Sequence, residues 1–289
     1  MALRRSWVQL PHGPLVEKDK YKAVWLSHSS IADFLNCPRY YFLRNIYKDP
    51  LTGHKITRMQ PPLALGQAIH EVIEELSNLP VDTRLVIPLT KKFEVAFAKV
   101  RGKKGGFKNK AQEDEYFKRG QEMIKKLQKN PGPLTQKAVK INQDLPSYWL
   151  SEDDKIILCG KIDWLEYLAE TDSVHIVDFK TGRIEENESS LQLPIYHLLV
   201  TNTQKRPVAK ASYWYLHTDT APREVKLPDL NQAYSQVYEI GKRIKLARQI
   251  EHFKCPKDGC KYCLPLEEII KGKGELVGES EYRQDIYIL

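Results

Sequence analysis

Apolar residues in the first half of the chain recur at the spacing of amphipathic helices. Those within residues 31–35 fall on one helical face, and Ser29 or Ser30 can cap the start of this helix. A longer apolar stripe covers residues 64–76 and ends before a proline. Two more helices are expected within residues 90–130. The first half is therefore predicted to be mostly helical.

The second half changes to short apolar runs that are typical of buried strands. These runs cover roughly residues 136–145, 156–165, 174–180 and 209–216. Helical spacing returns at residues 191–199 and again at residues 230–248. Helices followed by strands, with one helix between the last two strands, predict an α/β protein.

The strand predicted over residues 174–180 ends with two charges, Asp178 and Lys180. Residues two apart on a strand point to the same face, so the carboxylate and the amine project side by side. Taken alone, this pair is most simply a surface ion pair. Antiparallel pairing of residues 156–163 with this strand would bring Asp163 close to both charges. Two converging carboxylates favour Mg²⁺ or Mn²⁺, and a lysine beside them can orient or help to deprotonate water.

Other polar residues occur at helical spacing around these strands. Gly66 and His70 share one face of the helix predicted over residues 64–76, where a histidine is more often structural or solvent-facing than functional. Gln192 and Tyr196 lie one helical turn apart, directly downstream of the charged strand end. They therefore present a polar edge near Lys180 if the helix packs there.

Cysteine usage indicates a thiolate site. The chain has five cysteines, and an odd number without a secretion signal argues against a disulfide framework. Cys159 sits in an apolar run and is most simply a core residue. Four others remain for a thiolate site: Cys37, Cys255, Cys260 and Cys263. A proline directly after Cys37 kinks or restarts the first helix there.

The composition, 42% hydrophobic and 28% charged over 289 residues, is that of a globular protein. No apolar run approaches membrane-spanning length and the N-terminus lacks a signal-peptide core, so we expect a cytoplasmic protein without a membrane partner. The net charge of +8 is compatible with a polyanionic partner. Lys103, Lys104 and Lys108, in a glycine-rich basic loop, either grip phosphates or belong to a solvated linker.

Taken together, these motifs resemble the PD-(D/E)xK nuclease superfamily. The likeness is to RecB/AddB-type nuclease domains and to CRISPR-associated exonucleases with four cysteines. The matching elements occur in the family order: Ser29-x-x-x-x-Phe34-x-x-Cys37-Pro-Arg, Gly66-x-x-x-His70, Gly160-Lys-Ile-Asp163, Asp178-Phe-Lys180-Thr-Gly182 and Gln192-x-x-x-Tyr196. One departure is that no Pro-Asp dipeptide precedes the first acid. The resemblance implies a restriction-endonuclease-like core, with a central mixed sheet flanked by helices.

The resemblance also implies roles for individual residues. The metal ligands for Mg²⁺ or Mn²⁺ would be His70, Asp163, Asp178 and the backbone carbonyl of Phe179. Lys180 would be the catalytic lysine. Gln192 and Tyr196 would position that lysine or the nucleic-acid strand.

In the resembling proteins, one N-terminal and three C-terminal cysteines hold a [4Fe–4S] cluster that joins the two ends of the domain. Cys37 and the pair Cys260 and Cys263 match this arrangement. Cys255 departs from it, because relatives usually place the last cysteine after the pair. The resemblance implies the same cluster here, and a four-cysteine structural zinc is the alternative.

We therefore expect an N-terminal extension at residues 1–25, a nuclease domain at residues 26–265 with a helical insertion at about 90–130, and a tail at residues 266–289. The expected function is metal-dependent hydrolysis of DNA, as an exonuclease on single strands or free ends in recombination, repair or CRISPR adaptation. A helicase or a recombination or adaptation protein is the expected partner. The alternative is a non-catalytic subunit that binds DNA ends.

Overall fold

A four-stranded mixed sheet forms the centre of the computed structural model, which describes residues 22–289. Its strands are β5 (Trp164–Leu168), β6 (Ser173–Lys180), β7 (Val208–Tyr215) and β8 (Arg223–Val225), in that spatial order. β6 and β7 run parallel and the outer pairs run antiparallel. Helix α6 (Gln192–Thr203) makes the crossover between the two parallel strands. The predicted α/β class with a mixed sheet is therefore confirmed.

Two three-stranded sheets accompany the central one. The first has the order β1 (Val24–Leu26), β4 (Ile156–Cys159), β3 (Ser147–Ser151). The second has the order β2 (Lys55–Arg58), β10 (Gln284–Ile288), β9 (Glu275–Glu279). β2 pairs in parallel with β10, so the last residues of the chain are joined to a strand near its beginning.

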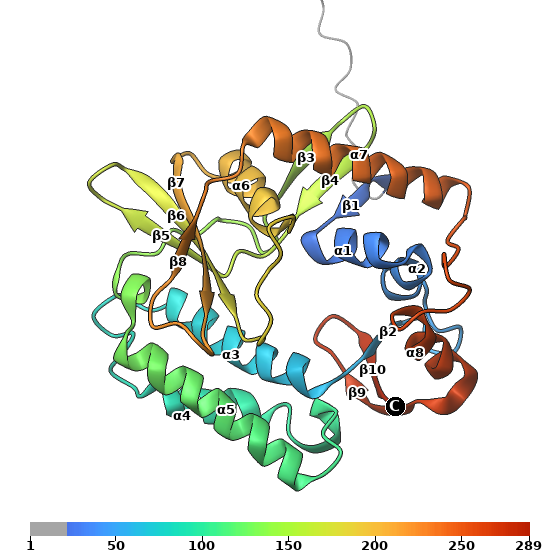
Figure 1. Ribbon diagram of the computed structural model, residues 1–289, viewed down its shortest axis with the longest axis horizontal. Coiled ribbons are helices and arrows are strands. Elements are labelled where there is room, and N and C mark those ends of the chain that lie inside the picture. The colour runs from blue at the N-terminus through green and yellow to red at the C-terminus, as the bar shows by residue number, and fades with distance from the viewer. Residues whose placement is uncertain (1–21) are drawn as a thin grey trace, which may run out of the picture.

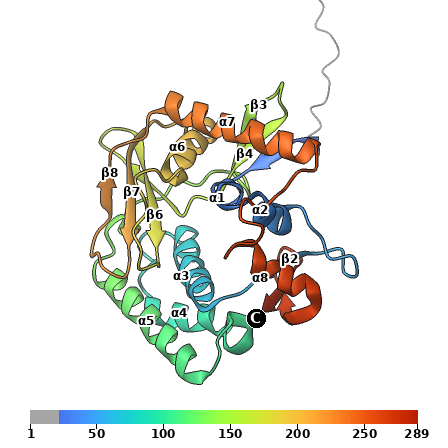
Figure 2. The same ribbon diagram turned by 45° about the vertical axis from the view of Figure 1, so that its right-hand side comes forward.

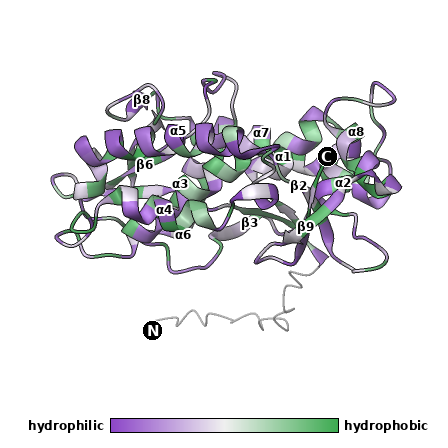
Figure 3. Ribbon diagram, turned by 90° about the horizontal axis from the view of Figure 1, so that it is seen from below, coloured by the Kyte–Doolittle hydropathy of each residue, from purple (hydrophilic) through white to green (hydrophobic). Residues whose placement is uncertain are grey.

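Helices cover both faces of the central sheet. Figures 1 and 2 show α3 (Pro61–Ser77), α4 (Leu89–Ala98) and α5 (Lys110–Lys129) together on one side of it, and α6 and α7 (Leu230–Gln249) on the other. α1 (His28–Asn36) lies beside β1 and α7, whereas α2 (Pro38–Asn45) and α8 (Cys263–Glu268) lie at the far end near β2. The outer helices carry hydrophilic and hydrophobic residues side by side (Figure 3), as amphipathic helices do.

The apolar core follows this layering. One buried cluster joins α1, α6 and α7 to one face of the central sheet, and a second joins α3, α4 and α5 to the other face through residues such as Phe179 and Trp214. A third, smaller cluster surrounds Cys37, Cys255 and Cys263. The central sheet is thus buried on both faces, and the chemistry described below sits at the end of its strands.

Most predicted helices are confirmed. The first is capped by Ser27, not by Ser29 or Ser30 as predicted, through the Ser27 hydroxyl that accepts from the Ser30 N–H. The proline after Cys37 does restart the helix, because Cys37 ends α1 in an extended conformation and precedes α2. Within residues 22–289, none of the helices combines the length and the hydropathy that crossing a bilayer requires.

Two strand predictions are wrong. Residues 136–145 form a single bridge, between Ala138 and Glu166, and the strand lies later, at β3. Residues 156–165 are not one strand but parts of β4 and β5, which belong to different sheets. The break falls at Gly160, where a Cβ would lie 2.9 Å from Leu199 of α6, so the close approach of that helix favours glycine.

The predicted extension at residues 1–25 lies outside the described residues except for its end, where Val24 begins β1. Within residues 266–289, β9 and β10 complete the sheet with β2. The domain boundaries stay a prediction.

Candidate functional site

Asp163, Asp178 and Lys180 meet at one end of the central sheet. β5 begins at Trp164, which pairs with Val177 of β6, so Asp163 lies directly before β5 and opposite the end of β6. The Asp163 carboxylate accepts a hydrogen bond of 3.0 Å from the Phe179 N–H. The predicted proximity of the two acids is therefore confirmed, but β5 provides the antiparallel partner and residues 156–163 do not.

His70 reaches this sheet end from α3. Its Nδ1 lies 3.2 Å from Asp163 Oδ1. Burial acts to lower the pKa of His70, but the Asp163 carboxylate outweighs it and the pKa is raised. α3 runs close to the end of β6, since a Cβ at Gly66 would lie 3.4 Å from Thr181 Oγ1. The helix therefore presents His70 to the acid at the start of β5.

Asp178 is the most buried charge of the site, with 1% of its surface exposed. Its Oδ1 accepts a hydrogen bond of 2.6 Å from Gln192 Nε2, which also lies 3.2 Å from the Tyr196 hydroxyl. Burial and repulsion by Asp163 raise the pKa of Asp178 to about 7. The polar edge predicted for α6 thus contacts the second acid directly.

Lys180 lies between three oxygen-bearing side chains. Its Nζ is 3.0 Å from Asp178 Oδ2 and 2.9 Å from Glu186 Oε1, and it donates to Gln192 Oε1. Burial acts to lower the pKa of Lys180, but Asp178 and Glu186 outweigh it and the pKa is raised. The ammonium also lies 5.2 Å from the centre of the Tyr213 ring. The lysine is therefore a fixed cation at the strand end.

The sequence prediction missed two residues near Lys180. Glu186 comes from the loop after β6, and His28 comes from the first turn of α1. Burial and Lys180 lower the pKa of His28, against the opposite effect of Glu186. His28 lies one residue before the N-terminal family motif and Glu186 lies outside all five motifs, so neither residue carried a sequence signal.

The acids fit a hard divalent cation in one respect. Asp178 Oδ2 is buried and has no hydrogen-bond partner, although Lys180 lies at ion-pair distance. A buried carboxylate oxygen that is held only by an ion pair is a suitable ligand for Mg²⁺ or Mn²⁺. The predicted carbonyl ligand of Phe179 stays a prediction; the Phe179 ring itself is buried and stacks on Trp214 at 5.4 Å.

The four predicted cysteines do come together. Among the described residues they form the one group of three or more histidine, cysteine and acidic side chains whose ligand atoms all lie within 4.8 Å of one another. Burial acts to raise the pKa of the Cys260 thiol, but backbone N–H groups of Cys263 and Tyr262 lower it to about 7. Cys159, in contrast, is buried in β4, and burial raises its pKa to about 11. The four-cysteine group joins the N-terminal segment at Cys37 to the C-terminal segment, and Cys159 is the core residue predicted.

The predicted phosphate-gripping lysines are exposed around the short 3-10 helix η2 (Gly102–Gly105). Lys103 pairs with Glu275 of β9 at 2.8 Å, whereas Lys104 and Lys108 form no ion pair within residues 22–289. The loop is anchored, because the Gly102 N–H donates to the Glu113 carboxylate at 2.7 Å. The start of the loop is therefore fixed against α5, and contact of its lysines with phosphates stays a prediction.

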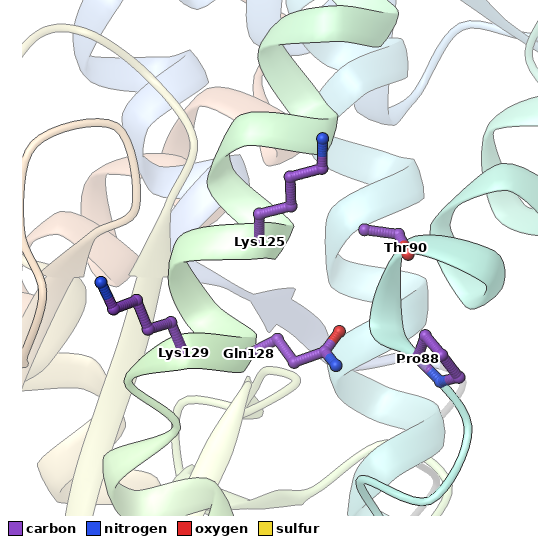
Figure 4. Close-up of a pocket in the computed structure, with 5 residues that line it drawn as sticks. All are labelled: Pro88, Thr90, Lys125, Gln128 and Lys129. Atoms are coloured by element: carbon purple, nitrogen blue, oxygen red, sulfur yellow. The ribbon is translucent and has the colours of Figure 1, made fainter.

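Two cavities flank these features. One of about 850 Å³ adjoins the site and is lined in part by Glu186, Tyr213 and Tyr215. The other, of about 450 Å³, lies between α4 and α5 and is lined by Pro88, Thr90, Lys125, Gln128 and Lys129 (Figure 4). None of the predicted site residues lines the second cavity.

The sequence pattern of the PD-(D/E)XK nuclease superfamily matches residues 25–265, and the chain belongs to this superfamily. The crystal structure of a candidate exonuclease from Eubacterium rectale is similar, with 14% identity and a TM-score of 0.47 over 90% of this chain and 94% of that one. At that identity and TM-score the likeness carries no functional inference. No curated protein matches the chain.

Proposed function

We propose that the protein is a metal-dependent DNA nuclease that hydrolyses phosphodiester bonds at single-stranded or free DNA ends. The observation that carries the proposal is the meeting of Asp163, Asp178 and Lys180 at one sheet end. These are the residue types of the superfamily motif in the order the superfamily requires. The catalytic unit would span residues 26–265.

His70, Asp163, Asp178 and the Phe179 carbonyl would hold Mg²⁺ or Mn²⁺. When bound, this cation supplies positive charge that stabilises the phosphate in the transition state. Lys180 would hold the attacking water or a phosphate oxygen, because its ammonium is fixed at the strand end. Gln192 would keep Asp178 and Lys180 in place through its hydrogen bonds to both, and Tyr196 would hold the Gln192 amide.

Lys103, Lys104 and Lys108 would contact the DNA backbone, since exposed lysines bind phosphates regardless of sequence. A helicase or a recombination or adaptation protein would supply the ends. A role in recombination, repair or CRISPR adaptation is consistent with an end-directed nuclease.

The four cysteines would hold a metal centre that joins the two ends of the domain. The resemblance to four-cysteine exonucleases supports a [4Fe–4S] cluster. The compact spacing of the sulfurs supports a single structural zinc instead, because four Zn–S bonds of about 2.3 Å place tetrahedral sulfurs within ~4 Å of one another.

The nuclease proposal is tested with linear and circular single-stranded DNA incubated with Mg²⁺ or Mn²⁺. We expect the linear form to be degraded and the circular form to resist, with Lys180→Ala slower by at least about 100-fold. Lys210→Ala, which removes an exposed lysine of β7, serves as the matched control. Wild-type protein that binds DNA ends without cleaving them would support the non-catalytic alternative, and cleavage that survives Lys180→Ala would contradict the assigned site.

A further inference from the structure

Glu186 is the carboxylate that touches Lys180 without belonging to the predicted metal ligands. An ammonium group has three N–H donors. Those of Lys180 face Asp178, Gln192 and Glu186, with Glu186 Oε1 at 2.9 Å. Asp178 is assigned to the metal, and Gln192 is uncharged. Glu186 is therefore the anion, among the described residues in contact with Lys180, that stays available to the lysine when a cation binds Asp178.

The loop holds Glu186 against the strand beside the lysine. The Glu186 N–H donates a hydrogen bond of 3.0 Å to the Tyr215 hydroxyl. Tyr215 is the residue of β7 that pairs in register with Lys180 of β6, and it is buried. Tyr215 thus fixes the backbone of Glu186 beside Lys180, the residue that the Glu186 carboxylate contacts.

Charge and burial make this contact more than a surface ion pair. The Lys180 side chain is 16% exposed and the Glu186 side chain 29% exposed. Burial acts to raise the pKa of Glu186, but Lys180 outweighs it and the pKa is lowered. A mostly buried ammonium that loses its carboxylate partner moves toward another anion or toward water. Among the described residues that contact this ammonium, Asp178, the predicted metal ligand, would be the one remaining anion.

We propose that Glu186 is a positioning residue for Lys180: it keeps the ammonium at the sheet end, facing the phosphate, when the Asp178 carboxylate is engaged by the metal. This inference rests on the proposed nuclease function. It deepens that function by assigning a residue that no motif identifies.

The test compares Glu186→Gln with Glu188→Gln, an exposed neighbour that loses the same charge. We expect Glu186→Gln to lower kcat by roughly 10- to 100-fold, as a misplaced catalytic group does, with little change in KM for DNA. Glu188→Gln should keep the wild-type kcat. Calorimetric titration of each variant with Mn²⁺ should give the wild-type affinity within about threefold, because Glu186 is not a metal ligand.

Tyr215→Phe tests the contact between Glu186 and Lys180 through the backbone of Glu186. It keeps the ring and removes the hydroxyl that holds the Glu186 N–H. We expect a smaller fall in kcat, and a double variant with Glu186→Gln no slower than Glu186→Gln alone, because both changes act on one interaction.

The outcomes separate this inference from the function it rests on. Cleavage by wild-type protein together with an unchanged kcat in Glu186→Gln overturns the positioning role and leaves the nuclease proposal standing. Mn²⁺ affinity that falls more than about tenfold in Glu186→Gln makes Glu186 a metal ligand and also overturns it. No cleavage by wild-type protein with either metal overturns the function, and the positioning role falls with it.

Discussion

Burial and a neighbouring carboxylate both disfavour the negative charge of Asp178. It is almost fully buried and shares the sheet end with Asp163, and these two causes raise its pKa to about 7. An unfolded chain releases this proton near pH 4. Between about pH 4 and about pH 7, Asp178 therefore keeps its proton in the folded, metal-free protein, whereas the unfolded chain has lost it.

This difference predicts how the stability of the metal-free protein depends on pH. A raised carboxyl pKa stabilises the folded state below the unfolded pKa, and this contribution is lost as the pH rises through the folded pKa. The free energy of unfolding should fall between about pH 4 and about pH 7 through this group, by at most about 1.4 kcal/mol per pH unit.

Urea unfolding in a chelator, at constant ionic strength, measures the effect of this proton. Asp178→Asn should remove that part of the slope, while Asp153→Asn, at an exposed turn, should keep it. An identical slope in wild type and Asp178→Asn would show that Asp178 is ionised throughout.

The predicted and missed residues of the site differ in what fixes their positions. Asp178 and Lys180 could be paired from sequence because alternation along a strand is local. Gln192 and Tyr196 could be paired because helical spacing is local too. Glu186 could not, because its contact with Lys180 depends on how a loop without periodicity folds back onto β7.

At the scale of elements, an apolar run does not determine which strand it pairs with. The run at 156–165 reads as continuous, but Cys159 ends a strand paired with β3, and Trp164 begins one paired with β6. Helices α3, α4 and α5 were easier to predict, since each carries its own buried stripe. The loop between α4 and α5 carries no periodicity that reveals its anchor, the hydrogen bond from the Gly102 N–H to the Glu113 carboxylate.

The exposed lysines of that loop give a prediction about DNA binding. Lys104→Ala with Lys108→Ala should weaken binding to single-stranded DNA. The slope of log affinity against log salt should fall by about 0.7 for each lost phosphate contact. Lys103→Ala should have a smaller effect, because Glu275 already neutralises Lys103.

Fluorescence anisotropy at several salt concentrations, without divalent metal, measures this slope. Lys210→Ala again serves as the control. If the Lys104 and Lys108 double variant keeps the wild-type slope, the loop does not contact the phosphates.

At the scale of the whole molecule, the N-terminal and C-terminal parts of the described chain are joined twice at the same place. β2 lies beside β10 (Figure 1) and pairs with it. The sulfur of Cys37 lies within 4.8 Å of those of Cys255, Cys260 and Cys263. Both connections span more than two hundred residues of sequence. The four cysteines indicated the second of these connections from the sequence. The β2–β10 pairing could not be predicted, because the sequence of a short strand does not determine which strand it pairs with.

Loss of the proposed four-cysteine metal centre should therefore separate the N-terminal and C-terminal segments before it affects the central sheet. Closing a loop of this length removes entropy from the unfolded chain worth about 5 kcal/mol, by analogy with a long-range disulfide. Cys37→Ser should lose the bound metal and lower the Tm by roughly 10 °C or more. Cys159→Ala, which changes a cysteine outside the group, should keep the full metal content.

Metal analysis and the visible spectrum of anaerobically purified protein identify the bound group in the same preparations. Iron with a broad brown absorption means a cluster, and colourless protein with one zinc means the single-ion site. Limited proteolysis should cut Cys37→Ser first around α8, because its buried residues Cys263 and Leu266 belong to the cysteine cluster alone. A Cys37→Ser variant with unchanged metal, Tm and proteolytic pattern would mean that the strand pairing of β2 with β10 alone holds the ends together.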